Sequence, residues 1–350
     1  WNNKTVNNRI MKQTFISIGN TLIPYLVAIA ASFLAAGLFI GVMGFDVLKA
    51  YETILFSSFR SPGAFTQTLV KFVPLLLQAL AFTIPLAAGK FNIGGEGQMI
   101  VGAIGAAGVG IVFANQPVYL LLPLVLIAGI VFGALWAAFP AWLLYRFGIN
   151  EILTTVLLNF VSFSVIDYVA TEIWGDPAAG HPTTVPIGAG GELPLLMERT
   201  NLHAGFIIAV FIAVIVYIYT NHTSAGYELI ATGANARASR AYGINVRSLF
   251  LLSLILGGAV AGLSGAIEVA GVHHRLIEGL QSNFLLLGLI IGLIAKGNHI
   301  GVPFVAFFIA VLEIGASSMQ RTMSIPGEMV FIVEALILLF ILLSDLVRKK

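Results

Sequence analysis

Four carboxylic acids lie within long apolar stretches of this sequence, at Asp167, Glu268, Glu313 and Glu334. A charged side chain is costly in the core of a bilayer, so such residues usually face a protein interior or a water-filled path. None has an obvious Lys or Arg partner in the same stretches, which weakens the case for a proton relay. These acids therefore remain open to a structural interpretation, as hydrogen-bonded groups, and to a functional one.

A polar, glycine-rich segment, GKFNIGGEGQM, interrupts two apolar runs between Gly89 and Met99. Glycine permits tight turns and close approach of backbones, and the segment also carries one carboxylate and two amides. Non-helical backbone at membrane depth is tolerated only inside protein or beside a water-filled cavity. The segment either dips into a bilayer and lines a pathway, or forms a plain turn with Glu96 in the first turn of the next helix.

Other chemistry is missing from the sequence. It has no cysteine, which excludes thiol chemistry, disulfides and cysteine metal sites. His273 and His274 are adjacent and point in different directions, which argues against a shared metal ion. No Ser/His/Asp spacing, HExxH or GxxxxGK[ST] motif occurs. We therefore expect no catalytic site and no bound cofactor on this chain.

Composition decides the class of protein. Hydrophobic residues make up 58% of the 350 residues, and charged residues only 10%. A water-soluble fold could not hide that much apolar surface or cover its outside with so few charges. The sequence predicts an all-α polytopic membrane protein and excludes a disordered chain, a disulfide scaffold and a nucleic-acid-binding protein.

A helix needs about 20 apolar residues to cross the hydrocarbon core, and we identify about ten such runs. The eighth is short and the second contains Pro74 and Pro85, so each is a candidate for a broken or tilted helix. The first is too long for a signal-peptide core. The predicted spans are residues 20–43, 67–88, 97–114, 118–145, 151–172, 202–220, 248–270, 282–295, 300–318 and 328–346.

Twelve of the 18 Lys and Arg residues fall on the inner side if both termini are cytoplasmic, which favours that orientation. Residues 1–350 then form a single transmembrane domain with three notable connections. Residues 44–66 are an outer insertion, residues 173–201 an outer loop rich in Pro and Gly, and residues 221–247 the longest inner connection. Activity must come from the helices or from partners that dock on these loops.

Four-residue glycine spacings occur in several predicted spans and allow two helix backbones to approach closely. We interpret them as packing contacts within a helix bundle. The pairs are Gly37/Gly41, Gly129/Gly133, Gly258/Gly262 and Gly288/Gly292.

The inner connection contains the segment GYELIATGANARASRAYGINV. Residues 234–241 are rich in alanine, which favours a short helix, and Gly233 and Gly243 bracket them. Arg237 and Arg240 are three residues apart and therefore share a face. A short helix held rigidly between two spans is suited to fit a cleft in another protein.

This segment resembles the cytoplasmic coupling-helix motif of ABC importer permeases, in the group that includes branched-chain amino acid, simple sugar and nucleoside permeases. The pattern is G-x-N-x-x-A-x-x-x-Y/A-G-I, with Ser239 where the group usually has a second alanine. FNIGGEGQM resembles the start of the third span in the nucleoside branch. The residues assigned to coupling by this resemblance are Glu228, Gly233, Asn235, Arg237, Arg240, Tyr242 and Gly243.

The resemblance implies a translocation subunit in the bacterial cytoplasmic (inner) membrane. A second permease chain, commonly a different one, would complete the pathway. A separate ATPase with two nucleotide-binding halves would hold ATP and Mg and dock on the coupling helices, and an extracytoplasmic binding protein or lipoprotein would deliver substrate. The resemblance further implies an inverted repeat of spans two to five and seven to ten, with residues 91–98 and 278–283 at corresponding connections.

A nucleoside carries no net charge and offers a π-face, ring donors and acceptors, and ribose hydroxyls. Its path needs aromatic and amide side chains, whereas a phosphate would need buried Lys or Arg, of which we find none well inside a span. A neutral polar substrate is favoured. The candidate pathway residues are Phe91, Asn92, Gly94, Glu96, Gln98 and Glu268.

Three alternatives to a nucleoside permease are considered. A sugar or branched-chain amino acid ABC permease is the nearest. A self-sufficient secondary transporter would couple to Na⁺ or H⁺ through Asp167, Glu268 or Glu334, but it has no need of an ATPase-docking helix. A membrane-embedded enzyme is the third, and the missing catalytic constellation counts against it.

Overall fold

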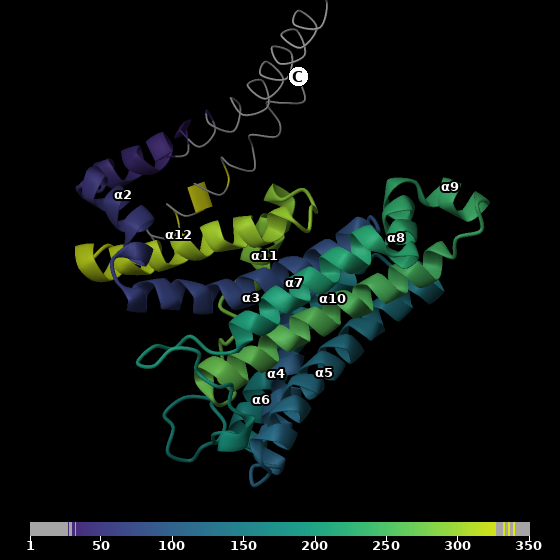
Figure 1. Cartoon of the computed structure of the whole chain (residues 1–350), viewed down its shortest axis with the longest axis horizontal. Coiled ribbons are helices and arrows are strands. Elements are labelled where there is room, and N and C mark those ends of the chain that lie inside the picture. The colour runs from purple at the N-terminus through teal and green to yellow at the C-terminus, as the bar shows by residue number, and fades with distance from the viewer. Residues whose placement is uncertain are drawn as a thin grey trace, which may run out of the picture. The chain divides into compact units, whose positions relative to one another are not determined.

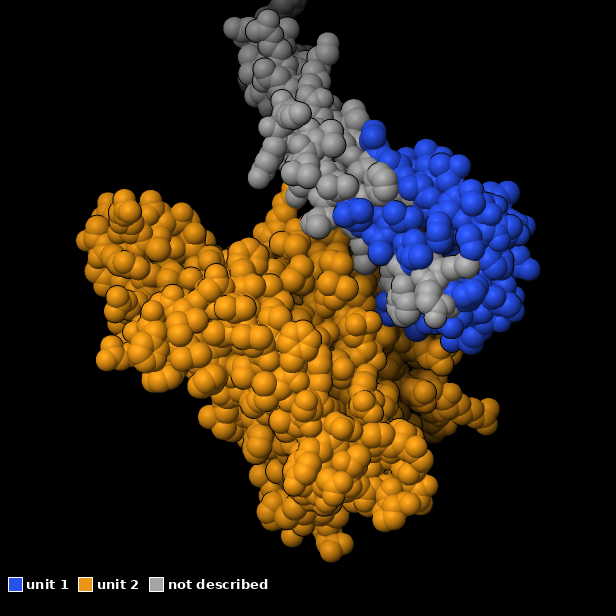
Figure 2. Space-filling model, turned by 180° about the vertical axis from the view of Figure 1, so that it is seen from behind, with its two compact units in different colours: residues 1–60, 311–350 blue, residues 61–310 orange. Residues whose placement is uncertain are grey.

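The computed structural model describes residues 33–326 and isolated positions beside them. The chain divides into two compact units, residues 1–60 with 311–350 and residues 61–310, which Figure 2 colours blue and orange. Regular structure in the described residues is helical, and only isolated β-bridges occur, in and around the 173–201 loop. The prediction of an all-α fold is confirmed for this part of the chain.

The elements are labelled in Figure 1. They are α2 (Val47–Phe56), the 3₁₀ turn η1 (Ser57–Phe59), α3 (Pro62–Ala87), α4 (Gly95–Val112), α5 (Val118–Phe147), α6 (Glu151–Tyr168), the π-helical turn η2 (Val169–Ile173), the 3₁₀ turn η3 (Ala189–Gly191), α7 (Gly205–His222), α8 (Ser224–Ala234), α9 (Ala236–Ala241), α10 (Val246–Glu268), the π-helical turn η4 (Val269–His273), α11 (Phe284–Ile294) and α12 (Gly301–Met323).

Seven of the ten predicted spans coincide with helices that are long and apolar enough to cross a membrane, namely α3 to α7, α10 and α12. The eighth span is short, as predicted, because α11 has 11 residues. Of the first span, an apolar helix is described over Phe33–Val42. The tenth span, 328–346, lies almost wholly outside the described residues.

The second span is not broken, which corrects one of the two expectations for it. Helix α3 runs on through Pro74 and Pro85. Proline lacks an N–H, so Pro85 leaves the carbonyl of Ala81 without its helical donor. The Nδ2 group of Asn92 donates to that carbonyl oxygen at 3.4 Å. A side chain from the following connection thus satisfies the backbone group that the proline frees.

Glycines bring the backbones of α4, α5 and α10 into direct contact in the unit of residues 61–310. A methyl added to Gly102 on α4 would meet the backbone of Gly262 on α10. One added to Gly262 would in turn meet the carbonyl oxygen of Gly129 and lie 2.8 Å from the Cα of Gly133, both on α5. The predicted packing contacts of the Gly129/Gly133 and Gly258/Gly262 pairs are confirmed.

The remaining glycine pairs lie mainly against side chains. Gly288 and Gly292 on α11 lie against Gln78 and Phe82 of α3, and Gly37 lies against the side chain of Tyr51. In the unit of residues 61–310, the helices differ in how much of their most apolar 18-residue stretch is buried. The buried share is 78%, 67% and 61% for α3, α4 and α10, and 28% for each of α5, α6 and α7. The last three therefore present wide apolar faces, suited to lipid or to another chain.

Replacing Gly262 by alanine should destabilise the bundle, although alanine is the better helix former. The added methyl has no room between α10 and α5, and overpacking of this kind costs about 1–3 kcal/mol. The measurement is the thermal unfolding midpoint of the purified protein in detergent. The control is Gly63→Ala on α3, where the nearest atom to the new methyl is 3.9 Å away. Equal midpoints for the two variants would contradict the assignment.

Candidate functional site

Residues 88–94 connect α3 to α4 and enter the helix bundle without helical structure. The Nζ atom of Lys90 lies 3.3 Å from a carboxylate oxygen of Glu151, in the first turn of α6. Further along, the backbone of Ile93 contacts Asn159, eight residues up the same helix. Glu151 and Asn159 are about 12 Å apart along the axis of α6, and the connection lies beside this stretch of the helix. The segment therefore lies inside the bundle against α6, and Glu96 is in the first turn of α4, as the second interpretation expects.

The first turn of α4 is held by a reciprocal pair of side-chain amides. The Nδ2 group of Asn92 donates to Oε1 of Gln98 at 2.8 Å, and Nε2 of Gln98 donates to Oδ1 of Asn92 at 2.9 Å. Both residues are only 1% exposed. The same Oδ1 accepts the backbone N–H of Gly94 at 3.1 Å. Three predicted pathway residues thus come together, and they bond to one another.

Helix α6 supplies a third side-chain amide to this region, Asn159, which the sequence analysis missed. The Oδ1 atom of Asn159 accepts the backbone N–H of Gly97 at 2.9 Å, and its Nδ2 donates to the carbonyl of Ile93 at 2.8 Å. Asn159 belongs to a buried polar row on α6. The row consists of Glu151, Thr155, Asn159 and Ser162. Its spacing of four, four and three residues in an apolar span was the sequence signal that could have revealed it.

Helices α4 and α11 both begin inside the bundle, beside Gln78 of α3. A methyl on Gly95 would lie 2.5 Å from Oε1 of Gln78 and 2.9 Å from Cδ1 of Leu285. From there α11 runs beside α3 toward the Ala87 end, whereas α4 runs the opposite way, to the 173–201 loop. Gln78 is fully buried, and its Oε1 has no hydrogen-bond partner among the described residues. This glutamine is another residue that the sequence analysis missed.

Phe91 and Glu96 are the predicted pathway residues that keep some exposure. Phe91 is 38% exposed, and its ring centroid lies 6.1 Å from that of Phe82. Glu96 is half-buried and lies in the first turn of α4, where the helix dipole favours a carboxylate. Glu96 therefore lies in the first turn of a helix and also inside the bundle.

Glu268 lies in the last turn of α10 before η4, within electrostatic range of Lys71, whose ammonium lies over the ring of Phe284 at the start of α11. It is 5% exposed, and its Oε2 lies 3.6 Å from Nε2 of His273. Nearby, just before α7, burial and the neighbouring His274 lower the pKa of His203 to about 4. The imidazole of His203 is therefore neutral at pH 7, and its Nδ1 accepts the backbone N–H of Gly205 at 3.2 Å.

Asp167 and Glu313 are the other acids of the apolar stretches that the structure describes. Asp167 is exposed on α6, and Glu313 is half-buried on α12. Glu334 lies outside the described residues. Among the described residues no cluster of three or more His, Cys, Asp or Glu could hold a metal ion.

The 221–247 connection folds into two helices, α8 and α9 (Figure 1). The prediction of one helix over 234–241 bracketed by glycines is corrected, because Gly233 lies within α8 and Asn235 separates the helices. Asn235 has φ −157° and its side chain accepts the N–H groups of Arg237 and Ala238 at 3.1 and 3.0 Å. Gly243, at φ +85°, follows the end of α9 in the left-handed region.

The candidate coupling side chains point outward. Glu228, Arg237 and Arg240 are exposed, and Tyr242 is 88% exposed. Helix α8 adds apolar side chains to this surface, which the sequence analysis missed. Tyr227 is 72% exposed and Ile230 is 44% exposed. These two residues are three apart and share a face. Exposed aromatic and arginine side chains are typical anchors of protein interfaces.

Comparison with known proteins places this architecture in a family. The family model described as "Branched-chain amino acid transport system / permease component" matches residues 64–342. The chain belongs to this permease family. It is 31% identical to the glucose ABC transporter permease protein TsgB13 of Haloferax volcanii, over 96% of this chain and 90% of that protein.

Two further relatives are bacterial. The chain is 32% identical to the guanosine ABC transporter permease protein NupP of Bacillus subtilis, over 95% of each chain. It is 30% identical to the nucleoside ABC transporter permease protein NupB of Lactococcus lactis, over 93% of this chain and 92% of that protein. The chain is therefore a transport subunit, and its several apolar helices make it a multi-pass membrane protein.

Substitution of either amide in the pair should destabilise the fold. Asn92→Ala and Gln98→Ala each leave a buried partner unsatisfied, at about 1–3 kcal/mol. Asn92→Ala should cost more, because Asn92 also bonds Gly94 and Ala81. The double variant should cost less than the sum, since the second amide no longer has a partner to lose. Thermal unfolding in detergent measures these differences, with the exposed amide of Gln116 as the Gln116→Ala control. Strictly additive losses would contradict the pairing.

Proposed function

We propose that this chain is a permease subunit of an ATP-driven, binding-protein-dependent importer of nucleosides. The observation that carries the proposal is the FNIGGEGQM segment, which enters the bundle and surrounds the start of α4 with amide and aromatic groups. Identity of 32% and 30% to a guanosine permease and a nucleoside permease supports the same substrate class.

The pathway is proposed to pass the point where α4 and α11 begin. Discontinuous helices that start at mid-depth commonly line the substrate path in transporters with inverted repeats. The opposite directions of α4 and α11 support the inverted repeat that relates residues 91–98 to residues 278–283. Phe91, Glu96 and Glu268 are the candidates for contact with solute, whereas Asn92 and Gln98 hold the start of α4.

The exposed face of α8 and α9 is proposed to dock on a separate ATPase that binds ATP and Mg. Arg237, Arg240 and Tyr242 would form this contact together with Tyr227 and Ile230. A second permease chain is proposed to cover part of α5 to α7. This chain is similar both to NupP and, at 26% identity, to the guanosine ABC transporter permease protein NupQ of the same bacterium, which supports an assembly of two related permeases. We place the complex in the cytoplasmic membrane, with both termini inside.

A sugar is the second candidate substrate, favoured by 31% identity to a glucose permease. The test is to purify the tagged chain from its native host with its partners, reconstitute the complex in liposomes, and measure uptake of labelled guanosine, uridine and glucose. We expect ATP-dependent uptake of the nucleosides and none of glucose. Uptake of glucose alone would refute the nucleoside assignment. Uptake by the isolated chain under an ion gradient would refute the importer assignment.

Reversing one charge on the docking helices should uncouple the complex. Arg237→Glu places a carboxylate on the exposed face of α9, so ATPase docking should weaken. Transported substrate should then no longer stimulate ATP hydrolysis. The measurements are copurification of the ATPase and substrate-stimulated hydrolysis in liposomes. The control is Arg146→Glu, another exposed arginine at the end of the bundle where α5 ends and α10 begins. Normal coupling in an assembled Arg237→Glu complex would refute the docking assignment.

A further inference from the structure

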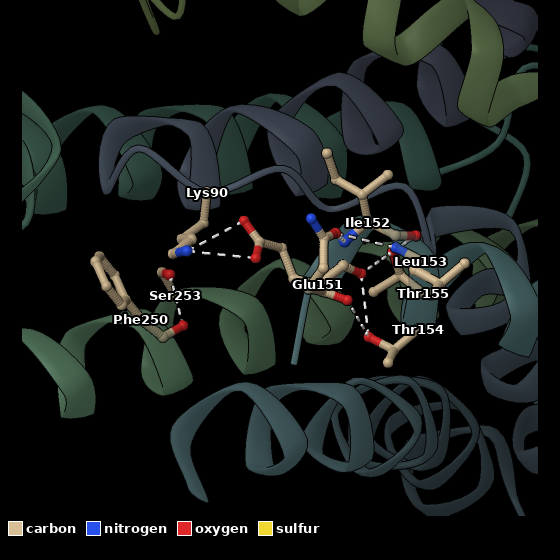
Figure 3. Close-up of polar contacts among 9 residues, drawn as sticks. Lys90, Glu151, Ile152, Leu153, Thr154, Thr155, Phe250 and Ser253 are labelled. Carbon is tan, nitrogen blue, oxygen red and sulfur yellow. Dashed lines mark hydrogen bonds and ion pairs between the residues drawn. The ribbon is translucent and has the colours of Figure 1, made fainter. Parts of the chain in front are cut away.

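An ion pair ties the 88–94 connection to two neighbouring helices. The Nζ atom of Lys90 lies 3.3 Å from each carboxylate oxygen of Glu151. Figure 3 draws these two contacts as dashed lines. The same ammonium lies 4.7 Å from the ring centroid of Phe250 on α10. The two charged side chains keep only 18% and 10% of their exposure. One lysine therefore joins the connection to α6 and α10 at the point where it enters the bundle.

This ion pair is a strong determinant of where the connection lies. Glu151 is in the first turn of α6, where the helix dipole favours a carboxylate. When one partner of a buried pair is removed, the other is left as an uncompensated charge, which is strongly unfavourable. Backbone hydrogen bonds from Ala88, Gly89 and Lys90 to Pro85 and Leu86 hold the start of the connection to the end of α3. The position of the rest of the connection, residues 91–93, depends on side chains, and the pair of Lys90 with Glu151 fixes the point from which it runs.

A second contact joins the same connection to the docking helices. A methyl on Gly233 of α8 would meet the carbonyl oxygen of Ala87 and lie 2.9 Å from the N atom of Gly89. Conversely, a methyl on Gly89 would lie 3.3 Å from the Cα of Gly233. The backbone of α8 at Gly233 packs directly against the backbone of residues 87–89, with no side chain between them that could change its rotamer. A displacement of α8 is therefore passed directly to residues 87–89.

We propose that Lys90 and Glu151 are positioning residues for translocation, through which movement of α8 reaches the start of α4. The proposal rests on the proposed function, because it needs an ATPase bound to α8 and α9. In one state the ion pair holds the connection against α6 and α10. When α8 shifts residues 87–89, the connection moves against this pair, and the amide-held start of α4 moves with it.

A merely structural ion pair would affect stability and assembly, whereas a positioning pair changes how much solute is moved for each ATP hydrolysed. The test compares this ratio for Lys90→Met, Glu151→Gln and Lys90→Arg in the reconstituted complex with its partner permease, ATPase and binding protein. In the first two variants the ratio should fall roughly tenfold or more, because a buried charge is left unpaired. Lys90→Arg should keep the ratio, since a guanidinium pairs with a carboxylate and stacks on a ring. The control is Arg146→Met, which removes an exposed charge.

The contact at Gly233 is tested in the same assay. Gly233→Ala forces α8 away from Ala87, so the ratio should fall as it does in Lys90→Met. The double variant should be no worse than the poorer single variant, because the two contacts act in series. Gly63→Ala, where the added methyl has room, is the matched control.

The outcomes separate this inference from the function on which it rests. If no ATPase copurifies with the native chain, the proposed function fails. If the native complex moves another solute, the substrate assignment fails and the ratio is measured with that solute. If the native complex is coupled and Lys90→Met and Glu151→Gln are coupled equally well, the inference is overturned. If Lys90→Met does not assemble, Glu151→Gln decides alone, because glutamine keeps the volume and a hydrogen-bonding oxygen.

Discussion

Backbone groups inside an apolar bundle need hydrogen-bond partners, and this requirement governs the centre of the structure. The chain leaves helical structure after α3 and starts it again only at α4, well inside the bundle. Pro85 frees the carbonyl of Ala81, which Asn92 takes up. The N–H of Gly97 is taken up by Asn159. Side-chain amides thus replace the hydrogen bonds that a continuous helix would have made for itself.

The helices around residues 88–94 are packed more tightly than the connection itself. Helices α4, α5 and α10 meet backbone to backbone through glycines, and such close contacts leave little freedom for one helix to slide on another. The connection, in contrast, is held by single hydrogen bonds and one ion pair. The connection is therefore the part of this region that is most easily displaced, and in the proposed coupling it carries the movement of α8 to the start of α4.

Much of the fold could be predicted from the sequence, because apolar run length and glycine spacing are local signals. Seven spans and the Gly129/Gly133 and Gly258/Gly262 contacts were predicted in this way. The partners of the central segment could not be, since Lys90 and Glu151 are 61 residues apart and only the tertiary fold pairs them. The boundary of α9 was wrong for a different reason. Gly233 was predicted to precede the helix, but α8 continues through it to Ala234. Asn235 is the better helix N-cap, and its extended backbone ends α8 while its side chain caps α9.

Charge also argues for an uncharged solute at the start of α4. Among the described residues, two cations lie near this region, and each contacts a neighbouring side chain. Lys90 pairs with Glu151, and the ammonium of Lys71 lies 4.5 Å from the ring centroid of Phe284. A phosphate-bearing solute would have to draw one of these cations from its partner and leave that partner uncompensated. A nucleoside would need no such exchange, because it carries no phosphate, and the partly exposed ring of Phe91 suits its ring face. The Lys90 pair that disfavours a phosphate is the same pair that we propose to position the connection, so the two proposals, on selectivity and on coupling, rest on one contact.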